Sequence, residues 1–221
     1  MAAANLCLRG ENDLKYLTFK TAIGICGLMW SDLGIKRVAL PGSEAEDPLR
    51  VLRADGGDCL VEEQSAPEFV ADAARRLRAW LSGAQGDISG VPLDLTSCTR
   101  FARAVYATLR LVPPGEVVTY GELARRAGHR NAARAVGRAL ARNPLPLLIP
   151  CHRVVGRGYM ANRLFATDPG TESDSGLGGY SGAGGVATKR LFLAIDDCRV
   201  SSGALQLGGD TETEGFRESR T

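Results

Sequence analysis

The sequence predicts an α/β N-terminal domain, a small antiparallel sheet plus a helix, followed by a mainly α-helical C-terminal domain with a helix-turn-helix. Three observations lead to this fold class. Residues 16–41 alternate short β-rich runs with turns. Residues 66–81 place apolar side chains at helical spacing. From Thr99 onwards, further helical patterns are separated by proline and glycine.

The domain boundaries follow from length and composition. A chain of 221 residues fits two modest domains. We expect a small α/β domain at 1–95, the helix-turn-helix domain at 96–199, and a disordered tail at 200–221, which is rich in Ser, Gly, Thr and Glu. With 44% hydrophobic and 24% charged residues, and no apolar run of membrane-spanning length, we expect no membrane partner. The N-terminus lacks a secretory signal pattern, which predicts an intracellular protein, nuclear if the source is eukaryotic and otherwise cytoplasmic.

The N-terminal elements are predicted from β-rich runs and one amphipathic pattern. The strands of an antiparallel meander are expected at 16–21, 27–31 and 35–40. Residues 42–58 have the composition of acidic and glycine-rich loops. The helix at 66–81 has apolar residues at helical spacing, and this face would cover the sheet: Phe69, Ala73, Leu77 and Trp80 or Leu81. Glycines and a proline in 83–97 then indicate a connector.

The C-terminal domain is expected to begin and end with a helix. The first helix has four apolar residues on one face, which are Phe101, Val105, Leu109 and Val112. Pro113 and Pro114 end it, because proline cannot continue a helix. The last helix is expected from about Gly185 to Ile195, after a polar loop at 156–179.

Between these helices the sequence outlines a helix-turn-helix. Thr119 and Glu122 match a capping box, in which the hydroxyl and the carboxylate each bind a free amide. The helix therefore begins at Tyr120, and Gly128 ends it. Asn131 can then cap a second helix that continues to about residue 142.

Arginine is concentrated in one part of the chain. Residues 100–163 contain twelve arginines and only two acids, Glu116 and Glu122, a local balance of +10, although the whole chain carries +2. The remaining residues therefore carry −8. An excess made wholly of arginine indicates a polyanion-binding surface, with DNA or RNA as the leading partner.

Four arginines around the second helix of the motif recur at every fourth residue: Arg130, Arg134, Arg138 and Arg142. They form one stripe that can lie along phosphates. A solvated helix face is the alternative, but such faces usually mix lysine with acids and this one has neither. The small Ala132 and Ala133 would let this helix approach a groove closely while one long arginine reaches past the backbone.

The candidate nucleophile is Cys151, which lies between Pro150 and His152. A proline before it favours an extended, rigid approach to the thiol. We expect His152 and Arg153 to lower the pKa of the thiol and so favour the thiolate, which is the nucleophile. A buried structural cysteine beside an ordinary loop histidine is the alternative.

The cysteines as a set do not predict a metal site. They are widely scattered, at Cys7, Cys26, Cys59, Cys98, Cys151 and Cys198. There is no CxxC pair and there are only two histidines, so we expect neither a metal nor another cofactor. In a reducing compartment such cysteines are usually free.

Five short motifs occur in a fixed order, and together they resemble a known family. They are VTYGELA at 118–124, NAARAVG at 131–137, NP at 143–144, PCHRV at 150–154 and YSG at 180–182. The order and spacings are similar to those of the O6-alkylguanine-DNA alkyltransferases, also called methylated-DNA–protein-cysteine methyltransferases. The resemblance is strong over 101–155 and 179–196, and looser in the N-terminal part, at 27–30 and 34–35.

The resemblance implies DNA repair by stoichiometric, irreversible transfer of an alkyl group, typically methyl, to Cys151. The donor would be O6 of guanine or O4 of thymine in double-stranded DNA. The helix-turn-helix would enter the minor groove, and the alkylated guanine would be rotated out of the stack, because its oxygen is otherwise shielded. The protein would act as a monomer and a single-turnover methyltransferase.

The resemblance also implies roles for individual residues. In the catalytic set, His152 would take the thiol proton through a water, Asp196 would orient His152, Tyr120 would assist the departing guanine and Asn143 would hold the active-site turn. The expected DNA contacts are Arg134, Tyr120, Ala132, Ala133, Arg138, Arg142 and Arg153, with Arg134 filling the space left in the duplex. The substrate pocket would consist of Pro146, Val154, Val155, Tyr180 and Ser181.

Two features depart from the family pattern. Family members usually have a glutamate where counting from Lys189 places Asp196, one methylene shorter, so either the relay is weaker or the backbone lies closer. Residues 156–178 are also longer than the usual link, and 159–163 and 168–170 match no motif.

Two other functions fit parts of the sequence. An alkyltransferase-like protein that recognises a lesion without repairing it would lack the acceptor cysteine, and Cys151 is present. A transcription regulator built on the helix-turn-helix would bind an operator as a dimer, and no dimerisation element is evident in the sequence.

Overall fold

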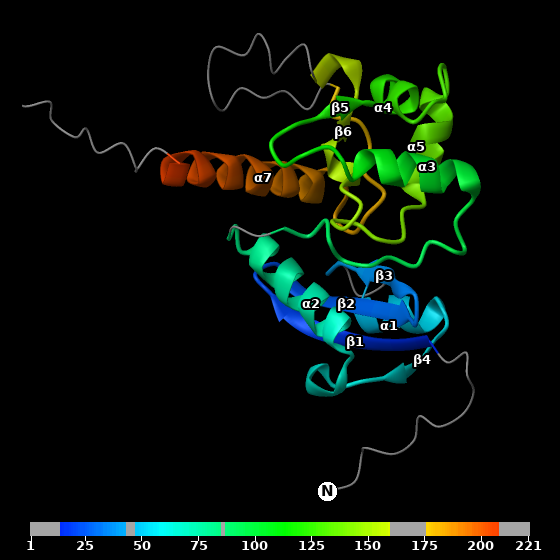
Figure 1. Cartoon of the computed structure of the whole chain (residues 1–221), viewed down its shortest axis with the longest axis vertical. Helices are drawn as coiled ribbons and strands as arrows, with labels where there is room; N and C mark the ends of the chain where they lie inside the picture. The colour runs from blue at the N-terminus through cyan, green and yellow to red at the C-terminus, as the bar shows by residue number, and fades with distance from the viewer. Residues whose placement is uncertain (1–13, 43–46, 85–86, 160–175, 208–221) are drawn as a thin grey trace, which may run out of the picture.

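The computed structural model describes residues 14–42, 47–84, 87–159 and 176–207, the last ten of them as backbone only. The sheet-containing part lies below the helical part in Figure 1, and the linker after α2 passes between them. Residues 160–163 and 168–170, from the stretches that match no motif of the family, lie outside the described residues. The tail from residue 208 also lies outside them. Within the described part, no helix combines the length and the apolar character that crossing a membrane requires.

The N-terminal part is a four-stranded sheet in the order β3-β2-β1-β4. Its strands are β1 (Leu14–Thr21), β2 (Gly24–Ser31), β3 (Gly34–Ala39) and β4 (Gly57–Leu60). The first three form the expected antiparallel meander, with Leu17 opposite Leu28 and Leu28 opposite Val38. The fourth strand pairs with β1 in parallel, so the sheet is mixed rather than purely antiparallel.

Residues 42–58, expected as loops, contain a helix and the start of this fourth strand. Helix α1 (Pro48–Ala54) begins where Asp47 accepts a hydrogen bond from the amide of Leu49, with proline in its first turn. Such caps start helices efficiently. With seven residues, α1 is too short for its apolar side chains to show a helical period.

Helices cover both faces of the sheet. Because successive side chains of a strand point to opposite faces, Tyr16 packs with Leu52 of α1, whereas Leu17 belongs to the cluster that includes Leu77 of α2. Helix α2 (Glu68–Leu81) is the helix expected at 66–81, and a short 3-10 turn, η2 (Glu63–Ser65), precedes it. The predicted sheet-plus-helix layer is therefore confirmed, with α1 as an addition.

The C-terminal part is mainly helical. Its elements are α3 (Arg100–Leu109), β5 (Val118–Thr119), α4 (Tyr120–Arg126), α5 (Ala133–Ala141), η3 (Cys151–Arg153), β6 (Val154–Val155) and α7 (Gly185–Leu207). Helix α4, a turn and α5 form the expected helix-turn-helix. The turn begins at Gly128, whose φ of +81° suits glycine, and the amide of His129 donates to the carbonyl of Ala124 at 2.8 Å.

Three local predictions need correction. Thr119 caps α4 by accepting from the amide of Glu122 at 3.2 Å, but the Glu122 carboxylate accepts from Arg125 and Arg126 instead of completing a capping box. Asn131 lies in the turn with φ of +65°, a conformation that asparagine tolerates, and the N-cap is Ala132. Helix α7 continues past residue 195 to Leu207, since no proline interrupts it, so the backbone at 200–207 is helical where we expected a tail.

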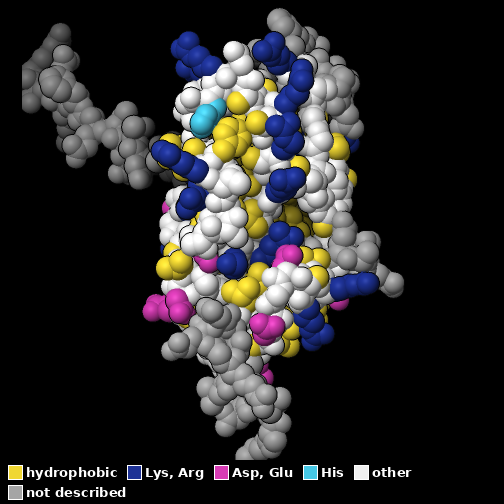
Figure 2. All heavy atoms as spheres, turned by 90° about the vertical axis from the view of Figure 1, so that its right-hand side faces the viewer, with side chains coloured by type: hydrophobic (Ala, Val, Ile, Leu, Met, Phe, Trp, Pro, Cys, Tyr) yellow, Lys and Arg dark blue, Asp and Glu magenta, His cyan; other side chains and the backbone are white. Residues whose placement is uncertain are grey.

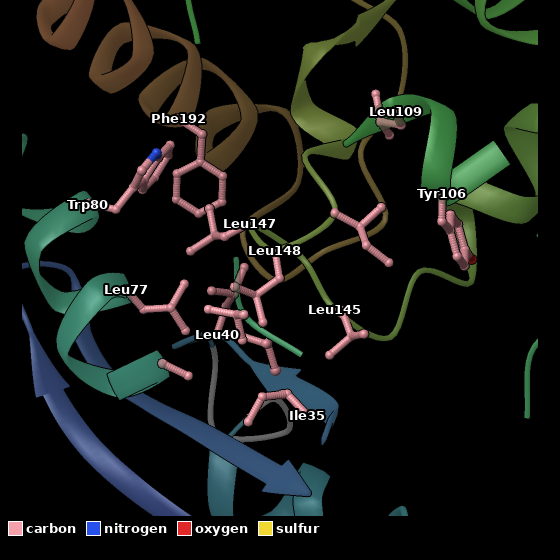
Figure 3. Packing of buried hydrophobic residues seen from close by; sticks show 14 of the residues in the cluster. Ile35, Leu40, Leu77, Trp80, Tyr106, Leu109, Leu145, Leu147, Leu148 and Phe192 are labelled. Atoms are coloured by element: carbon pink, nitrogen blue, oxygen red, sulfur yellow. The ribbon is translucent and has the colours of Figure 1, made fainter. Parts of the chain in front are cut away.

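One hydrophobic cluster joins the two parts of the molecule. It includes Leu77 and Trp80 of α2, Leu147 and Leu148 of the segment before Cys151, and Phe192 of α7 (Figure 3). The backbone also connects the parts, because the amide of Val38 donates to the carbonyl of Pro144 at 2.9 Å. The N-terminal part therefore supports the segment that leads into the cysteine.

The described cysteines do not all follow the expectation of free thiols. Cys26, Cys98 and Cys151 are free. Cys59 is disulfide-bonded, which corrects the expectation for that residue. Scattered cysteines give no pairing signal in the sequence, so spacing alone could not have indicated this bond.

Candidate active site

The segment before Cys151 is held in a tight turn by Asn143. Its side-chain amide donates to the carbonyl of Ile149 at 2.9 Å, and its side-chain oxygen accepts from the amide of Leu145 at 3.0 Å. Leu147 between them has φ of +71°, an unusual conformation for a branched residue that such bonds help to maintain. The hydrogen bonds of Asn143 thus hold this turn, and Cys151 follows it as the first residue of η3.

Cys151 lines two cavities. The first, about 300 Å³, lies between Tyr120, Gly137 of α5 and the segment containing Tyr180 and Ser181. The second, about 450 Å³, extends from Cys151 past Asn143 and Pro146 toward Arg37 of β3. The structure therefore brings together five residues that the sequence predicted for the site: Tyr120, Asn143, Pro146, Tyr180 and Ser181.

Close packing shapes the first cavity. A Cβ on Gly137 would lie 3.9 Å from the Tyr120 ring, an ordinary van der Waals contact, so α5 and the tyrosine ring lie side by side at the cavity. The hydroxyl of Ser181 donates to the carbonyl of Ala141 at 3.0 Å, which ties the Tyr180–Ser181 segment to α5. The wall of the first cavity therefore combines segments that are far apart in sequence, and they are held together at the helix-turn-helix.

Behind the cysteine, His152 pairs with Asp196 of α7. The side chains are fully buried, and His152 Nε2 lies 3.1 Å from Asp196 Oδ2. The shorter aspartate side chain therefore reaches the histidine, so this hydrogen bond is present although aspartate stands where the family usually has glutamate. Burial lowers the pKa of His152, although Asp196 opposes this shift, so the ring is neutral at physiological pH.

Arg153 is not placed to contact DNA, contrary to the sequence prediction. Its guanidinium is buried, with Nε 2.6 Å and Nη2 2.9 Å from the two oxygens of Asp196, and Nη1 donates to the carbonyl of Val112 at 2.6 Å. A side chain so engaged cannot reach a phosphate. Burial raises the pKa of Asp196, but the hydrogen bonds from His152 and Arg153 outweigh it and hold that pKa below the ordinary value.

The expected lowering of the Cys151 pKa is also corrected. Burial raises the pKa of the thiol, and it outweighs the opposing effects of a hydrogen bond from Asn143 and the charge of Lys189. Arg153, which we expected to help, is directed to Asp196. The resting thiol is therefore protonated, and its reaction requires a base.

Lys189 is a site residue that sequence reasoning missed. Its ammonium group is buried in α7 and donates to the carbonyls of Val154 at 2.6 Å and Leu177 at 2.8 Å. Burial lowers its pKa to about 8, and a negative charge on Cys151 would oppose this shift. A lone lysine on the apolar face of the closing helix was the available signal, since lysine is almost never fully buried without a partner.

Two predicted pocket residues serve the core instead. Val154 and Val155 are fully buried in β6, which pairs in parallel with β5. Val155 packs with Tyr159, Leu177 and Leu193 in a cluster separate from the main core. The Val154 carbonyl already accepts from Lys189. These residues therefore hold the cysteine segment against α4 and α7 and do not form the cavity wall around Cys151.

Two tyrosine hydroxyls belong to the site. Burial raises the pKa of Tyr120, and a negative charge on the nearby Cys151 would raise it further. The same holds for the pKa of Tyr180. Both hydroxyls are therefore protonated at physiological pH and can donate hydrogen bonds into the first cavity, which both residues line.

The helix-turn-helix presents a basic surface beside this cavity. Arg130, Arg134, Arg138 and Arg142 are exposed, and none has an ion-pair or hydrogen-bond partner among the described residues. Ala132 and Ala133 are partly exposed at the start of α5. In Figure 2, basic side chains run down the upper, C-terminal part of the molecule, while acidic side chains gather on the lower part. This face suits a polyanion.

No metal centre is evident in the part of the chain that the structure describes. There, no three side chains of His, Cys, Asp or Glu are grouped so that they could hold a metal ion.

Comparisons with known proteins agree on one class. The family described as "6-O-methylguanine DNA methyltransferase, DNA binding domain" matches residues 100–165, which include α4, α5 and Cys151. Two Mycobacterium tuberculosis structures share the fold. The first is an O6-methylguanine methyltransferase, with a TM-score of 0.59 and 27% sequence identity. The second is an OGT in complex with DNA, with a TM-score of 0.58 and 27% sequence identity. Each comparison covers 84% of this chain and 94% of the other chain. Fold and site thus define a methyltransferase with a DNA-binding domain.

Relatives in sequence identify the family. A methylated-DNA–protein-cysteine methyltransferase of Methanothermobacter thermautotrophicus is 30% identical over 170 residues, covering 77% of this chain and 78% of the relative. The Mus musculus protein of the same name is 37% identical over 192 residues, covering 82% and 80%. This chain therefore belongs to the methylated-DNA–protein-cysteine methyltransferase family, as its motifs predicted.

Proposed function

We propose that this protein repairs DNA by moving an alkyl group, typically methyl, from O6 of guanine to the sulfur of Cys151. One observation carries the proposal: Cys151 opens into a cavity whose wall includes α5, and α5 also bears Arg134 and Arg138, which have no partner among the described residues. A base lifted from DNA bound on α5 would therefore enter beside the sulfur. Transfer from O4 of thymine is a secondary reaction of the same geometry.

In the proposed reaction, His152 accepts the thiol proton through a water molecule. Asp196 supports this step because it binds Nε2, which leaves Nδ1 as the acceptor; Nδ1 has no hydrogen-bond partner among the described residues. The thiolate then attacks the alkyl carbon, forming a carbon–sulfur bond as the carbon–oxygen bond to guanine breaks. The departing guanine receives a proton with the help of the Tyr120 hydroxyl. The thioether product is stable, so each molecule reacts once.

The proposed DNA complex uses the minor groove and a rotated base. Ala132 and Ala133 are small enough for α5 to approach the groove floor, and Arg134 is long enough to fill the space that the guanine leaves. Arg138 and Arg142 would neutralise phosphates. Pro146, Tyr180 and Ser181 would contact the base and its alkyl group. The protein would bind as a monomer, since one cavity and one helix-turn-helix suffice.

A mass measurement tests the proposal. The protein is incubated with a duplex containing one O6-methylguanine, digested and analysed by mass spectrometry. One added methyl group on the peptide containing Cys151 is expected, in at most one copy per protein molecule. Cys151→Ala should bind the duplex and take up no methyl group, and a duplex with unmodified guanine should leave the wild-type protein unchanged. Binding of the methylated duplex without transfer would contradict the proposal.

A further inference from the structure

One residue of the N-terminal part reaches the histidine beside the acceptor cysteine. Trp80 lies near the end of α2 and is only 1% exposed. Its ring centroid is 5.6 Å from that of His152, with an interplanar angle of 59°. Contacts of this kind between rings stabilise a fixed mutual orientation. The imidazole is thus in contact with a residue that belongs to the other half of the molecule.

A second ring closes the group from α7. Phe192 is fully buried, and its ring centroid lies 5.5 Å from those of both His152 and Trp80, in edge-to-face arrangements. Figure 3 shows Trp80 and Phe192 facing each other from α2 and α7. The three rings therefore contact one another in pairs, and we call them the aromatic group.

The polar contacts of His152 lie on its other sides. Asp196 of α7 accepts a hydrogen bond from Nε2, and the cations Arg153 of η3 and Lys189 of α7 disfavour a positive charge on the ring. Cys151 precedes it in the chain. These groups set the charge around the imidazole, whereas the aromatic group contributes apolar surface that excludes water.

Trp80 contacts both His152 and a neighbouring cavity. A cavity of about 240 Å³ is lined by Trp80, Pro150 and Arg153 among others. This volume can hold several water molecules. Because the indole both lines this cavity and touches the imidazole, shortening it would open a route for water to His152.

We propose that Trp80 is a positioning residue for His152: its indole shields one side of the imidazole from bulk water and holds the ring against Asp196, so the N-terminal part contributes to alkyl transfer through the histidine. This inference rests on the proposed function. It assigns α2 a role that the sequence did not indicate, because Trp80 fits an ordinary apolar position of an amphipathic helix.

The first test observes the histidine itself and needs no substrate. The chain has only two histidines, so in a His129→Gln background the remaining imidazole signal in NMR belongs to His152. Trp80→Leu in this background should raise the titration midpoint of His152, because water then stabilises the charged ring. Trp80→Phe, which keeps a ring, should shift it less. An unchanged midpoint in both variants would overturn the inference.

The second test measures single-turnover methyl transfer across pH. Trp80→Leu should slow transfer about tenfold at pH 7, part of what a general base contributes, and should move the acid limb of the profile to higher pH. Trp80→Phe, which keeps an aromatic ring, should retain most of the wild-type transfer rate. The matched control is Leu77→Ala, which removes a buried side chain one turn earlier in α2 and should lower stability while leaving the profile in place.

The outcomes separate the two proposals. If the wild-type protein transfers no methyl group, the proposed function fails, while the NMR midpoints still decide the role of Trp80. If the wild type transfers and Trp80→Leu has the same profile as Leu77→Ala, the indole acts only as core and the inference fails. If Trp80→Leu does not fold, the smaller shift of the His152 titration midpoint expected in Trp80→Phe decides whether Trp80 positions the histidine.

Discussion

Arg153 and Asp196 form a buried, two-pronged ion pair, with Nε 2.6 Å from Oδ2 and Nη2 2.9 Å from Oδ1. His152 shares the same carboxylate. The aspartate thus holds both residues that follow the acceptor cysteine, and it joins η3 to α7. Structural support and, in the proposed reaction, proton transfer depend on one side chain.

Asp196→Asn should therefore damage both stability and transfer. Removing one partner of a buried ion pair leaves an uncompensated charge, which costs about 3–5 kcal/mol of the free energy of unfolding. Urea denaturation measures this loss, and single-turnover transfer should slow with it. Asp72→Asn is the matched control, because Asp72 is also shared by two arginines but lies on the surface of α2, and it should have a much smaller effect. Equal effects of the two variants would contradict the role of Asp196.

Arg134→Ala should slow transfer more than it weakens binding. If Arg134 fills the space left by the rotated guanine, its loss should reduce the transfer rate about tenfold, equivalent to about 1.4 kcal/mol. Single-turnover kinetics with saturating methylated duplex measure the rate. Arg75→Ala removes the same charge from an exposed position on α2 and should leave the rate unchanged. A normal rate in Arg134→Ala would show that another residue occupies the duplex.

The sequence predicted most of the elements that carry the site. Thr119 marks the start of the first helix of the motif because its side chain caps the helix, and Gly128 marks its end because glycine readily adopts a positive φ. Both features depend on a few neighbouring residues. The Asn143 turn followed from the family resemblance, and its hydrogen bonds are local too. Such features can be predicted because each is determined within a few residues of chain.

The failures concern side chains whose surroundings come from distant segments. Arg153 follows a reactive cysteine in sequence, which suggested a phosphate contact, but α7 supplies Asp196 from 43 residues away. The thiol pKa was expected to fall because sequence shows charged neighbours and not burial. Lys189 and Trp80 were missed because their partners, Val154 and His152, belong to other elements. Burial and long-range pairing are properties of packing that one sequence does not display.

Stability should decrease as the pH falls below neutral, and His152 should account for part of the decrease. Burial lowers the pKa of His152, so below the ordinary value of about 6.5 the unfolded chain binds a proton that the folded chain does not. The stability is therefore lost progressively from about pH 6.5 downward. Asp196, whose pKa is also lowered, adds a further loss below about pH 4.

Urea denaturation between pH 5 and pH 8 measures this dependence. His152→Gln cannot titrate, so its free energy of unfolding should vary less over this range than that of the wild type. His129→Gln removes the exposed histidine and should keep the wild-type slope. If His152→Gln and the wild type had parallel profiles, the histidine would not be buried in its neutral form.

Lys189→Met should shift the reactivity of the acceptor thiol to higher pH. The positive charge of Lys189 lowers the pKa of Cys151 against the larger effect of burial, so removing the charge should raise that pKa further. The carbonyls of Val154 and Leu177 also lose their donor, at a cost of about 1–3 kcal/mol for each buried group left unpaired. Iodoacetamide labelling followed on the peptide containing Cys151 distinguishes it from the other free thiols. Lys15→Met, an exposed lysine of β1, is the control and should leave the labelling profile unchanged. Because the labelling needs no DNA, an unshifted profile in a folded Lys189→Met variant would confine Lys189 to a structural role, independently of how the protein handles its substrate.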